Sequence, residues 1–439
     1  MTHLVNFSNL RVGNRFDAEF FSLKFLKAHN KLKNKNSTRL HDLCEFIRVG
    51  PSGEVLPASA YVSSGVKMYK PSNLNSWTCE NGTITYVSAD YCREKKLLLC
   101  RAGDVLLARV GDIKFGIVQN NNSTISSNLV VIRTRKELLD PYFLLAFLNQ
   151  EEGYDQIMRG SKRVSLASVA TSHIAEIFIP AVSFLKQKKI GNLVRKGLES
   201  QERAKMLFVK AQAVLQRAIK FQSFKKNQST KIFHLNELRQ AQRADAEFYL
   251  LKSTQQNQIK EISLGEIAKI FRGIEPGRGE YKTSGKLFLR ASNIDKFGLI
   301  DKSQKFISSQ FYEKFSKKYQ PDVGDILFVK DGKPGVACLL TEPLTGLISG
   351  SIVRLSFDQS VSARYVFLCI NSPFCQQQIL IDKDGSLQPH LKVERIEKLK
   401  IPIVEKEIEE QISELIKSSY INFNEGKRLL QEAKNLFNW

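Results

Sequence analysis

The sequence contains no run of 18 apolar residues, which is about the shortest stretch that a membrane-spanning helix needs. Its start, Met1–Arg15, lacks the apolar core of a secretory signal peptide. Seven cysteines are present, but no two have C-x-x-C spacing and their number is odd. These absences argue against a membrane span, a disulfide framework and a zinc site, and they predict a protein of the reducing cytoplasm.

The common catalytic motifs are also missing. The sequence has no GxxxxGK[ST] run, so a nucleotide-driven motor is not expected in this chain. The six histidines are scattered without HExxH spacing, and we assign them no metal. The glycines in the segment 271–279 do not follow GxGxxG order, and Pro276 interrupts them, which favours a loop between strands over a cofactor cradle.

Two further segments resemble catalytic motifs only in part. Asn371-Ser-Pro-Phe is close to a motif of adenine methyltransferases, and Asp322 followed by Asp331-Gly-Lys333 is close to a nuclease site for Mg²⁺. Neither pattern is kept in the other copy of the internal repeat described below, which favours a helix-ending turn and a turn after a strand. The sequence therefore predicts no catalytic residue, no metal site and no cofactor.

What the sequence has in excess is positive charge. The 439 residues include 66 Lys and Arg against 44 Asp and Glu, for a formal net charge of +22, while 42% hydrophobic residues are typical of a folded protein. Neutralised phosphates release counterions, so such a surplus favours a polyanionic partner. The alternative is an ordinary solvated surface rich in lysine.

The chain repeats itself at a period of about 220 residues, which fixes its architecture before any local assignment. Five segments recur in the same order. The pairs are Arg15-Phe-Asp-Ala-Glu19 with Arg243-Ala-Asp-Ala-Glu247, Ser72-Asn73 with Ser292-Asn293, Gly103-Asp104 with Gly324-Asp325, Leu148-Asn149 with Ile370-Asn371, and Ile179-Pro180 with Ile401-Pro402.

Each copy is predicted to begin as mixed α/β structure and to end in one long helix. Val105–Ala108 and Ile326–Val329 are short apolar runs after a Gly-Asp turn signal and predict buried strands, while 141–149 and 364–371 suit short helices. Beyond Ile179-Pro180, apolar residues follow alternating spacings of four and three, and the end of the second copy keeps the same register, as in a coiled coil.

One position of this heptad repeat is always occupied by a small residue. Glycine inside a helix costs roughly 1 kcal/mol, so close packing of the two helices should offset it, antiparallel if the copies are related by a pseudo-twofold axis. The alternative is that each helix lies separately on its own domain. The predicted seam consists of Gly197, Ala204, Ala211, Ser419, Gly426 and Ala433. A cysteine pair at Ala204 and Gly426 is the sequence-based test of this contact.

The doubled order of motifs resembles the specificity subunit of type I restriction-modification systems, over nearly the whole sequence. Besides the paired segments, the resemblance rests on Leu264-Gly-Glu-Ile-Ala268 leading to Gly273, and on Gln187 or Gln411 near the start of each long helix. The first copy departs from the pattern at Leu40-His-Asp-Leu-Cys44, which lacks the glycine found at Gly265.

The resemblance implies a fold of the α+β class: two tandem α/β target recognition domains, each followed by a long helix, with the two helices packing as an antiparallel coiled coil. The expected segments are 1–180 and 229–402 for the recognition domains, and 181–228 and 403–439 for the helices. It also implies that the domains read a bipartite, gapped site in double-stranded DNA. The partners would be modification (methyltransferase) subunits, in two copies, and a restriction subunit that acts as a motor.

Sequence is read by side chains at base edges, while Lys and Arg on phosphates set the register. The candidate DNA-binding residues of the first module are Lys67, Lys70, Arg109, Lys114, Lys162 and Arg163. Those of the second are Arg272, Arg278, Lys282, Arg290, Lys330 and Lys333. Arg109 and Lys330 stand at equivalent places after the Gly-Asp strand, which ranks them first. Neighbouring aromatic residues could contact bases, although core packing is favoured for each: Tyr69, Trp77, Tyr281 and Phe288.

Two other functions remain open at this point. A stand-alone restriction or methylation enzyme would need a cofactor or metal motif, and purified chain that modified or cut DNA unaided would support it. A basic RNA-binding scaffold would prefer structured or single-stranded RNA over duplex DNA in competition.

Overall fold

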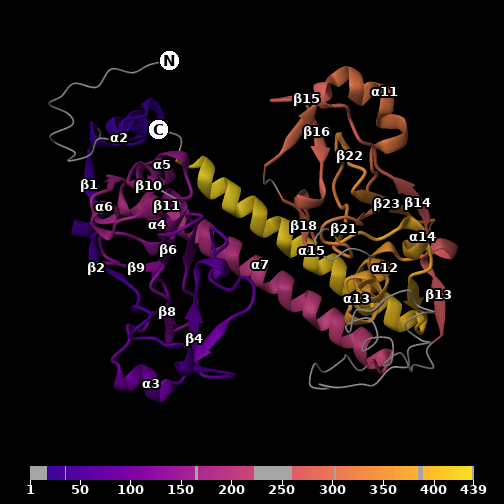
Figure 1. The fold of residues 1–439 in the computed structure, drawn as a ribbon, viewed down its shortest axis with the longest axis horizontal. Coiled ribbons are helices and arrows are strands. Elements are labelled where there is room, and N and C mark those ends of the chain that lie inside the picture. The colour runs from indigo at the N-terminus through magenta and orange to yellow at the C-terminus, as the bar shows by residue number, and fades with distance from the viewer. Residues whose placement is uncertain are drawn as a thin grey trace, which may run out of the picture. The chain divides into compact units, whose positions relative to one another are not determined.

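The computed structural model describes residues 17–34, 36–163, 167–221, 260–300, 303–358, 360–383 and 389–437. The chain divides into two compact units, of which unit 1 comprises Met1–Gln201 with Glu425–Trp439, and unit 2 comprises Glu202–Asn424. Two long helices, α7 (Phe184–Ala218) and α15 (Lys406–Asn435), each contribute one part to both units. Figure 1 shows α7 in magenta and α15 in yellow side by side.

Unit 1 is built on two four-stranded sheets. The first has the order β2-β9-β6-β7, and the second has the order β3-β5-β4-β8, in which β4 and β8 run parallel. Its strands are β1 (Ser37–Arg39), β2 (Cys44–Val49), β3 (Tyr61–Val62), β4 (Val66–Tyr69), β5 (Thr85–Val87), β6 (Val105–Ala108), β7 (Phe115–Ile117), β8 (Ser123–Ile125), β9 (Leu129–Thr134), β10 (Ser161–Arg163), β11 (Ala167–Val169) and β12 (Phe178–Pro180).

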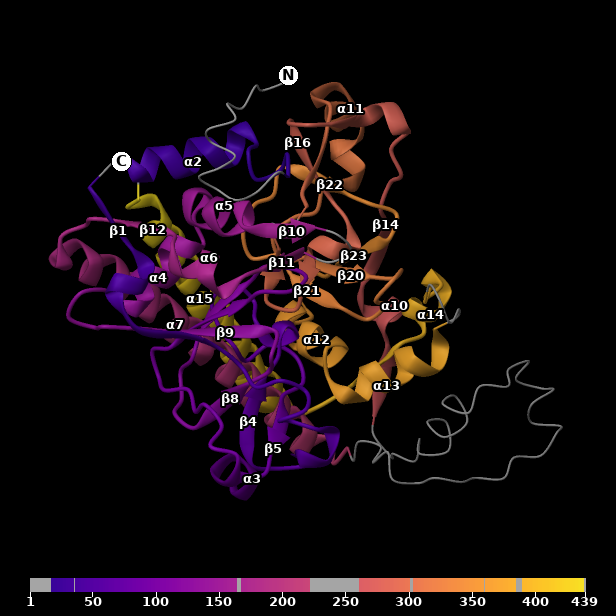
Figure 2. The same ribbon diagram turned by 60° about the vertical axis from the view of Figure 1, so that its left-hand side comes forward.

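Helices cover one side of the first sheet of unit 1, and one short helix lies by the second sheet. Figure 2 shows α4, α5 and α6 gathered near β9 and β12, whereas α3 lies by β4 and β5. The α-helices are α2 (Leu23–Lys33), α3 (Ala89–Glu94), α4 (Pro141–Leu148), α5 (Glu151–Arg159) and α6 (Thr171–Ala175), and the short 3₁₀ turns are η1 (Leu40–Leu43), η2 (Ala58–Ala60) and η3 (Pro71–Asn73). Because α4 is apolar on nearly all sides, every residue in it except Tyr142 is buried, in one core with residues of the sheet and of the long helices.

Unit 2 repeats the plan of two four-stranded sheets. Its sheets have the orders β14-β23-β20-β21 and β15-β19-β16-β22, the second again with one parallel pair, β16 and β22, and the hairpin β17-β18 is extra. Its strands are β13 (Glu261–Ser263), β14 (Lys269–Arg272), β15 (Tyr281–Lys282), β16 (Lys286–Leu289), β17 (Ile294–Asp295), β18 (Gly298–Leu299), β19 (Lys305–Ile307), β20 (Ile326–Val329), β21 (Ala337–Leu339), β22 (Gly346–Ile348), β23 (Ile352–Ser356) and β24 (Lys400–Pro402). Its helices are α10 (Leu264–Ile267), η4 (Arg278–Glu280), η5 (Ala291–Asn293), α11 (Ser309–Tyr319), α12 (Ala363–Ile370), α13 (Pro373–Asp382) and α14 (Val393–Glu397).

The matching sheet orders confirm the predicted fold class: two tandem α/β domains of one architecture, each followed by a long helix. The strands predicted at Val105–Ala108 and Ile326–Val329 have those bounds. The short helices predicted after them are α4 and α12, each begun by a side-chain cap at Asp140 or Ser362.

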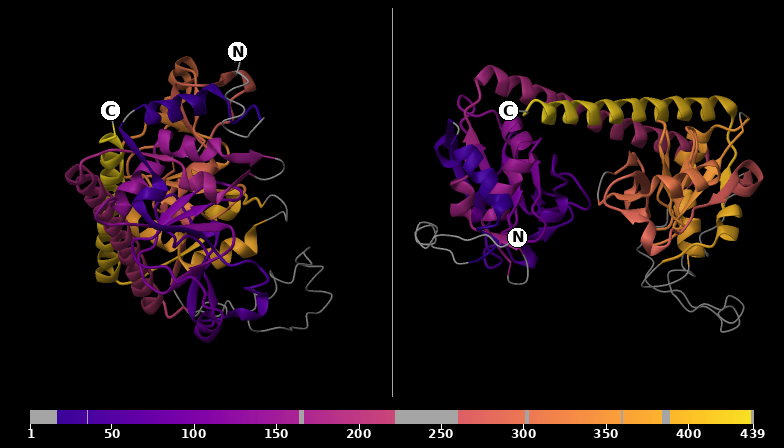
Figure 3. Two further views of the ribbon diagram at one scale, coloured as in Figure 1. Left: turned by 90° about the vertical axis from the view of Figure 1, so that its left-hand side faces the viewer. Right: turned by 90° about the horizontal axis from the view of Figure 1, so that it is seen from above.

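The two long helices pack on each other in antiparallel directions. In unit 1, a Cβ atom added to Gly197 would lie 3.0 Å from Leu430 Cγ, and one added to Gly426 would lie 2.7 Å from Gln201 Cγ, so the contacts move back along α15 as α7 advances. In unit 2, Ser419 Oγ donates a 2.7 Å hydrogen bond to the Ala204 carbonyl. Figure 3 shows the same pair of helices from two further directions.

These contacts change the choice of a cysteine pair. Ala204 lies against Ser419, whereas Gly426 lies against Gly197, so Ala204 and Gly426 are not opposite each other. The two positions on α15 are one heptad apart, or about 10 Å along the helix. The seam residues Ala211 and Ala433 are fully buried in the cores of unit 2 and unit 1.

The structure gives the local conformation at three of the motifs. Ile179-Pro180 and Ile401-Pro402 do not open the helices but end strands β12 and β24, which pair with β1 and β13. The missing glycine at His41 has no effect on the turn, because Leu40–Leu43 forms a helical turn like that of Leu264–Ile267. Of the two acidic motifs, only Asp17–Phe21 is described, and there Asp17 Oδ1 accepts the Phe20 amide. The motif at 243–247 lies outside the described residues.

A further difference concerns the start of the long helices. Gln187 Oε1 accepts the amide of Asp140, 3.1 Å away, and in unit 2 Glu409 Oε1 accepts the amide of Ser362, 3.4 Å away. The counterpart of Gln187 is therefore Glu409, and Gln411 is exposed. Both side chains attach a long helix to the first turn of α4 or α12, so each helix packs on a domain as well as on the other helix.

Candidate nucleic-acid interface

Arg109 and Lys330 occupy the same backbone frame at the end of equivalent strands. Arg109 follows β6, and its amide donates to the Asn128 carbonyl (3.0 Å) while its carbonyl accepts from Val169 (2.9 Å). Lys330 follows β20, and its amide donates to the Ser351 carbonyl (2.9 Å) while its carbonyl accepts from Leu391 (2.8 Å). The duplication thus places one long basic side chain at the same edge of each first sheet.

Strand β2, which is separated from β6 by β9, ends at the same edge of the sheet as β6. In unit 1, Val130 of β9 pairs with both Val49 and Leu107, so β2 and β6 end side by side. The next residue, Gly50, has no room for a side chain, because its Cβ would lie 2.3 Å from the Ser126 carbonyl oxygen. This close approach joins the edge of the first sheet to β8 of the second sheet.

Unit 2 repeats this close approach. Val353 of β23 pairs with Arg272 and Phe328, so β14 and β20 end together. Gly273 follows β14, and a Cβ atom there would lie 2.0 Å from the Ser349 carbonyl oxygen. Gly50 and Gly273 must therefore be glycine because backbone atoms occupy the place of a side chain. A positive φ angle is not the reason.

Several candidate residues gather at these edges. In unit 1, Lys114 lies at the start of β7, and the β10-β11 hairpin lies beside Val110 through a bridge to Ser168, which adds Lys162 to the edge. In unit 2, Arg290 lies at the end of β16, next to the serines at 349–351, and Lys333 lies in the loop after β20. Each edge therefore carries basic side chains from segments that are far apart in sequence. The side chains of Arg163 and Arg278 lie outside what the structure describes.

Two of the candidate arginines have a buried Nε atom without a hydrogen-bond partner among the described residues: Arg109 and Arg290. A buried donor that finds no partner costs about 1–3 kcal/mol, so an acceptor from a ligand would relieve that cost. For Arg290, another guanidinium nitrogen donates to the Ser303 carbonyl at 2.6 Å, which fixes the direction of the side chain.

Other candidates are held by acidic neighbours. Lys67 contacts Glu80 at 3.0 Å, Lys114 contacts Asp112 at 3.7 Å, Arg272 contacts Glu394 at 3.1 Å, and Lys330 contacts Asp331 at 2.7 Å. Exposed ion pairs contribute only about 0–1 kcal/mol, so Lys114 and Arg272 can exchange these partners for phosphates at little cost.

Lys67 belongs to a different environment from the edge residues. It lies within β4, and Glu80 also accepts a 2.6 Å hydrogen bond from the buried Tyr69 hydroxyl. Burial, together with this carboxylate, raises the pKa of Tyr69 well above its usual value. Lys70 lies over the ring of Tyr61 at 5.2 Å, and Lys282 donates to the Gly279 carbonyl at 3.0 Å.

The aromatic candidates divide by burial. Tyr69 and Phe288 are 1% and 0% exposed, so they form part of the core and present no ring face to a base. Trp77 is half-buried against the core of unit 1, with Lys434 over its ring at 5.4 Å. Tyr281 is 37% exposed and contacts Phe288 edge to face. It is therefore the most exposed of the four aromatic candidates.

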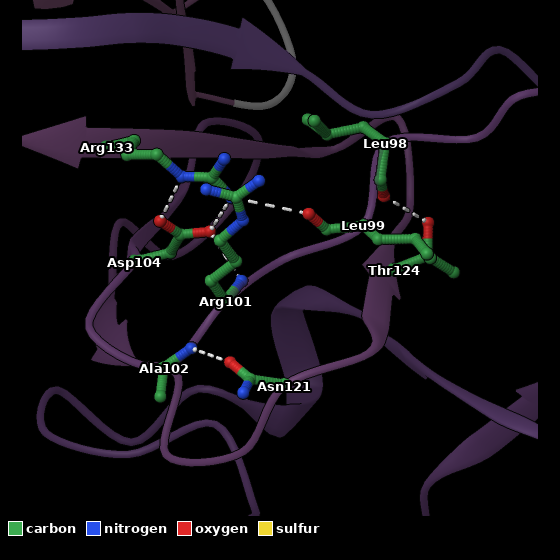
Figure 4. A network of polar contacts seen from close by, with 8 residues as sticks. All are labelled: Leu98, Leu99, Arg101, Ala102, Asp104, Asn121, Thr124 and Arg133. Carbon is green, nitrogen blue, oxygen red and sulfur yellow. Dashed lines mark hydrogen bonds and ion pairs between the residues drawn. The ribbon is translucent and has the colours of Figure 1, made fainter.

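A buried ion pair supports the Gly-Asp turn in each unit, and sequence reasoning missed it. In unit 1, Arg133 donates two hydrogen bonds to Asp104, at 2.8 and 2.7 Å (Figure 4). Its guanidinium lies 4.6 Å from the centre of the Phe46 ring. Asp104 also accepts the Arg101 amide, and the carboxylate raises the pKa of Arg133. The pair joins β9 to the turn before β6, the strand that ends just before Arg109.

In unit 2 the equivalent pair is looser. Arg354 Nε lies 3.5 Å from Asp325 Oδ2, and Arg354 instead donates to the Gln320 carbonyl at 2.6 Å, over the ring of Phe271. Burial raises the pKa of Asp325, and Arg354 offsets only part of this shift. The two arginines stand at the same distance along the chain from their Gly-Asp turns, which was the available signal for them.

The nuclease-like residues do not come together. Asp322 precedes β20 and Asp331 follows it, so the two carboxylates lie at opposite ends of one strand. In the described residues no group of three or more His, Cys, Asp or Glu side chains could hold a metal ion. All seven cysteines are buried free thiols. Within the same described segments, no helix has the length and apolarity to cross a membrane.

Comparison with solved structures found 14% sequence identity to the S subunit of a type I restriction-modification system from M. genitalium, over 92% of this chain and 96% of that one, with a TM-score of 0.44. The HsdS subunit from Thermoanaerobacter tengcongensis is 14% identical over 92% and 95% of the two chains, with a TM-score of 0.30. No curated protein matched the sequence.

The family model of the type I restriction modification DNA specificity domain matches residues 256–434. This segment holds all of the described α/β part of unit 2 and most of α15. The resemblance predicted from the doubled motifs is thereby confirmed. Over residues 256–434, the chain is similar to the type I restriction modification DNA specificity domain.

Proposed function

We propose that the chain is a sequence-reading subunit that recognises a bipartite, gapped duplex DNA site, with one half-site for each α/β domain. The observation that carries this proposal is the shared frame of Arg109 and Lys330, each at the end of a sheet edge with further basic residues around it. Two copies of one frame in a single chain fit a site with two half-sites. The recognition domains are proposed to span 1–180 and 229–402, with helical segments at 181–228 and 403–439.

Charge supports duplex DNA as the ligand. A net charge of +22 supplies salt-dependent affinity for phosphates, whichever bases are present. The edge residues add contacts from loops, which can reach into the major groove, where the four base pairs differ in their donors and acceptors. The proposed division is that Lys114 and Arg272 exchange their carboxylates for phosphates, while Arg109 and its neighbours read base edges.

Catalysis is proposed to come from partner subunits. The exposed sides of α7 and α15 carry large apolar residues that no described core covers, and such residues are typical of a protein interface. They are Leu185, Met206, Val209 and Ile421, which are 82%, 59%, 61% and 60% exposed. Two copies of a modification subunit that methylates DNA would dock on these helices, and a restriction subunit would join the same complex.

Methylation mapping tests the proposal most directly. The methylated bases of the source genome are read by single-molecule sequencing with and without the gene, with the partner genes expressed. The expected result is loss of one bipartite, gapped adenine-methylation motif when the gene is absent. An unchanged pattern in the presence of expressed partners would refute the proposed function. Methylation or cleavage of DNA by the purified chain alone would show a stand-alone enzyme.

Binding measurements on single variants test the interface itself. Arg109→Ala and Lys330→Ala should each weaken binding to the cognate duplex about 5- to 150-fold, because each removes one base or phosphate contact. Lys210→Ala is the matched control: Lys210 is an exposed lysine on α7 and is not one of the candidate edge residues, so its loss should leave affinity within about twofold. Equal effects of all three substitutions, or stronger binding to structured RNA than to duplex DNA, would contradict the assignment.

A further inference from the structure

The edge of unit 2 carries a side-chain cluster that unit 1 does not have. Asp331 lies directly after Lys330, and Lys330 Nζ contacts Asp331 Oδ2 at 2.7 Å. On the other side, His390 Nδ1 is hydrogen-bonded to Asp331 Oδ1. The carboxylate is therefore fixed at both oxygens, by one residue of its own strand end and by one that is 59 positions away.

The cluster is not needed to hold the backbone together. Asp331 and His390 form an isolated antiparallel bridge, and Val110 and Ser168 form the same bridge in unit 1. The hydrogen bonds at Arg109 and Lys330 flank these bridges in the same way. Because valine and serine fit the same frame, the acid and the imidazole of unit 2 have a role other than packing.

The carboxylate remains accessible in this arrangement. The Asp331 side chain is 34% exposed and that of His390 is 44% exposed, whereas Lys330 is only 14% exposed. An ionised carboxylate has about four lone-pair positions, so two bound donors leave room for at least one more. The accessible group is thus an acceptor, held in place by a largely buried lysine.

An exposed acceptor is unusual on a surface that meets a polyanion. Phosphates repel a carboxylate, so Asp331 cannot add affinity by backbone contact. In the major groove, by contrast, Asp and Glu accept hydrogen bonds from the exocyclic amino group of cytosine, and adenine also presents an amino group there. The positive charge of Lys330, directly beside Asp331, reduces the repulsion that a carboxylate meets near DNA.

We propose that Asp331, oriented by Lys330 and His390, is a base-reading residue of the second domain. It accepts a hydrogen bond from an exocyclic amino group, cytosine N4 or adenine N6, in one base pair of the second half-site. This inference rests on the proposed function and deepens it, because it assigns one specificity contact to one unit. The first domain, with Val110 and Ser168 in this frame, makes no such contact.

The test replaces the cluster by the pair that unit 1 already uses. The full chain with Asp331→Val and His390→Ser is expressed with its modification subunits in a host that has no methylation of its own, and the methylated motif is read genome-wide. One position of the second half-site should become degenerate, with a loss of preference of about 5- to 150-fold, while the first half-site stays unchanged. The base pair at that position, C·G or A·T, identifies which amino group is read.

Controls separate this contact from other causes. Asp322→Val removes an exposed carboxylate at the opposite end of β20 and should leave the motif as it is. An unchanged motif in the double variant would overturn the inference and leave the proposed function standing. Loss of all methylation, with a wild-type unfolding temperature, would overturn it too, because the cluster would then serve binding in general. A wild-type chain that directs no bipartite motif would instead overturn the proposed function, and this inference with it.

As a second variant, Asp331→Asn keeps the size of the side chain and adds an amide donor. Where the wild-type chain reads cytosine, the variant should shift the preference at that position toward adenine, and where it reads adenine, the variant should keep adenine. The reason is that an amide recognises adenine through one donor and one acceptor. A shift at any other position would contradict the assignment.

Discussion

Alanine at Gly426 should push the two long helices apart, and the structure sets the size of the effect. A Cβ atom there would lie 2.6 Å from the Gly197 carbonyl oxygen and 2.7 Å from Gln201 Cγ. The oxygen belongs to helix backbone and cannot rotate away, so α7 or α15 must shift by several tenths of an ångström along a seam that is otherwise closely packed.

Two free-energy terms of opposite sign decide the result. Alanine gains about 1 kcal/mol over glycine inside a helix. Overpacking a close interface costs about 1–3 kcal/mol, and contact with backbone puts Gly426 in the upper part of that range. We expect Gly426→Ala to lower the free energy of unfolding by about 1–2 kcal/mol. For a unit of this size the unfolding temperature should fall by about 2–8 °C.

Gly197→Ala provides a graded comparison on the other helix. Its Cβ would first meet the Leu430 side chain at 3.0 Å and then the Gly426 oxygen at 3.1 Å, and a side chain can adjust. The helix-propensity gain should therefore cancel most of the cost, to within about 0.5 kcal/mol. Glu199→Ala, at an exposed position of α7, should be neutral. Thermal unfolding of the four chains would refute this reasoning if Gly426→Ala were as stable as wild type, or if Gly197→Ala were the more damaging of the two.

Three other predictions concern single contacts. Cysteines in place of Ala204 and Ser419, which touch across the helices, should form a disulfide under mild oxidation, seen as a mobility shift on a non-reducing gel. Asp104→Ala should cost about 3–5 kcal/mol in chemical denaturation, because it leaves the guanidinium of Arg133 buried without its partner. Burial, and then nearby positive charges, lower the pKa of His29 to about 4. The neutral ring therefore stabilises the fold above about pH 6.5, and about 1–2 kcal/mol should be lost between pH 6.5 and 4 but retained in His29→Gln.

Each of these has an outcome that would contradict it. Oxidation that leaves the Ala204 and Ser419 pair reduced, while cysteines at Ala204 and Gly426 do crosslink, would show a different helix register. An Asp104→Ala chain with the denaturation midpoint of wild type would show that Arg133 finds water instead. Identical acid-unfolding curves for wild type and His29→Gln would assign the loss to other groups.

The repeat and the helix seam were readable from the sequence because both depend on short-range order along the chain. Gly-Asp turns before apolar runs gave the bounds of β6 and β20, and a heptad pattern with one small position gave α7 and α15. The strands that end in Ile179-Pro180 and Ile401-Pro402 were missed because each is only three residues long and its partner strand is far away in sequence. The signal of proline before a helix was stronger than that of a short edge strand.

Among the candidate DNA-binding residues, the sequence indicated types and repeat positions but not their surroundings. It ranked Arg109 and Lys330 together, and the structure places them in one shared frame; their contact with DNA stays a prediction. It could not show that Lys67, which lies within β4, forms an ion pair with Glu80. A lysine in a strand has the same sequence signal whether it faces solvent or a carboxylate brought in from another turn.

The sequence by itself determined that this protein is a duplication, with an α/β domain and a long helix in each copy and a strong surplus of positive charge. Only the tertiary structure decided what stands at the two edges. In one unit it is an Arg109 Nε that has no partner among the described residues, and in the other a carboxylate held between Lys330 and His390. The physical reason is distance along the chain. Periodicity and turn signals act over a few residues, whereas Asp331 meets His390 only after the sheet has formed and the segment after α13 has returned to it.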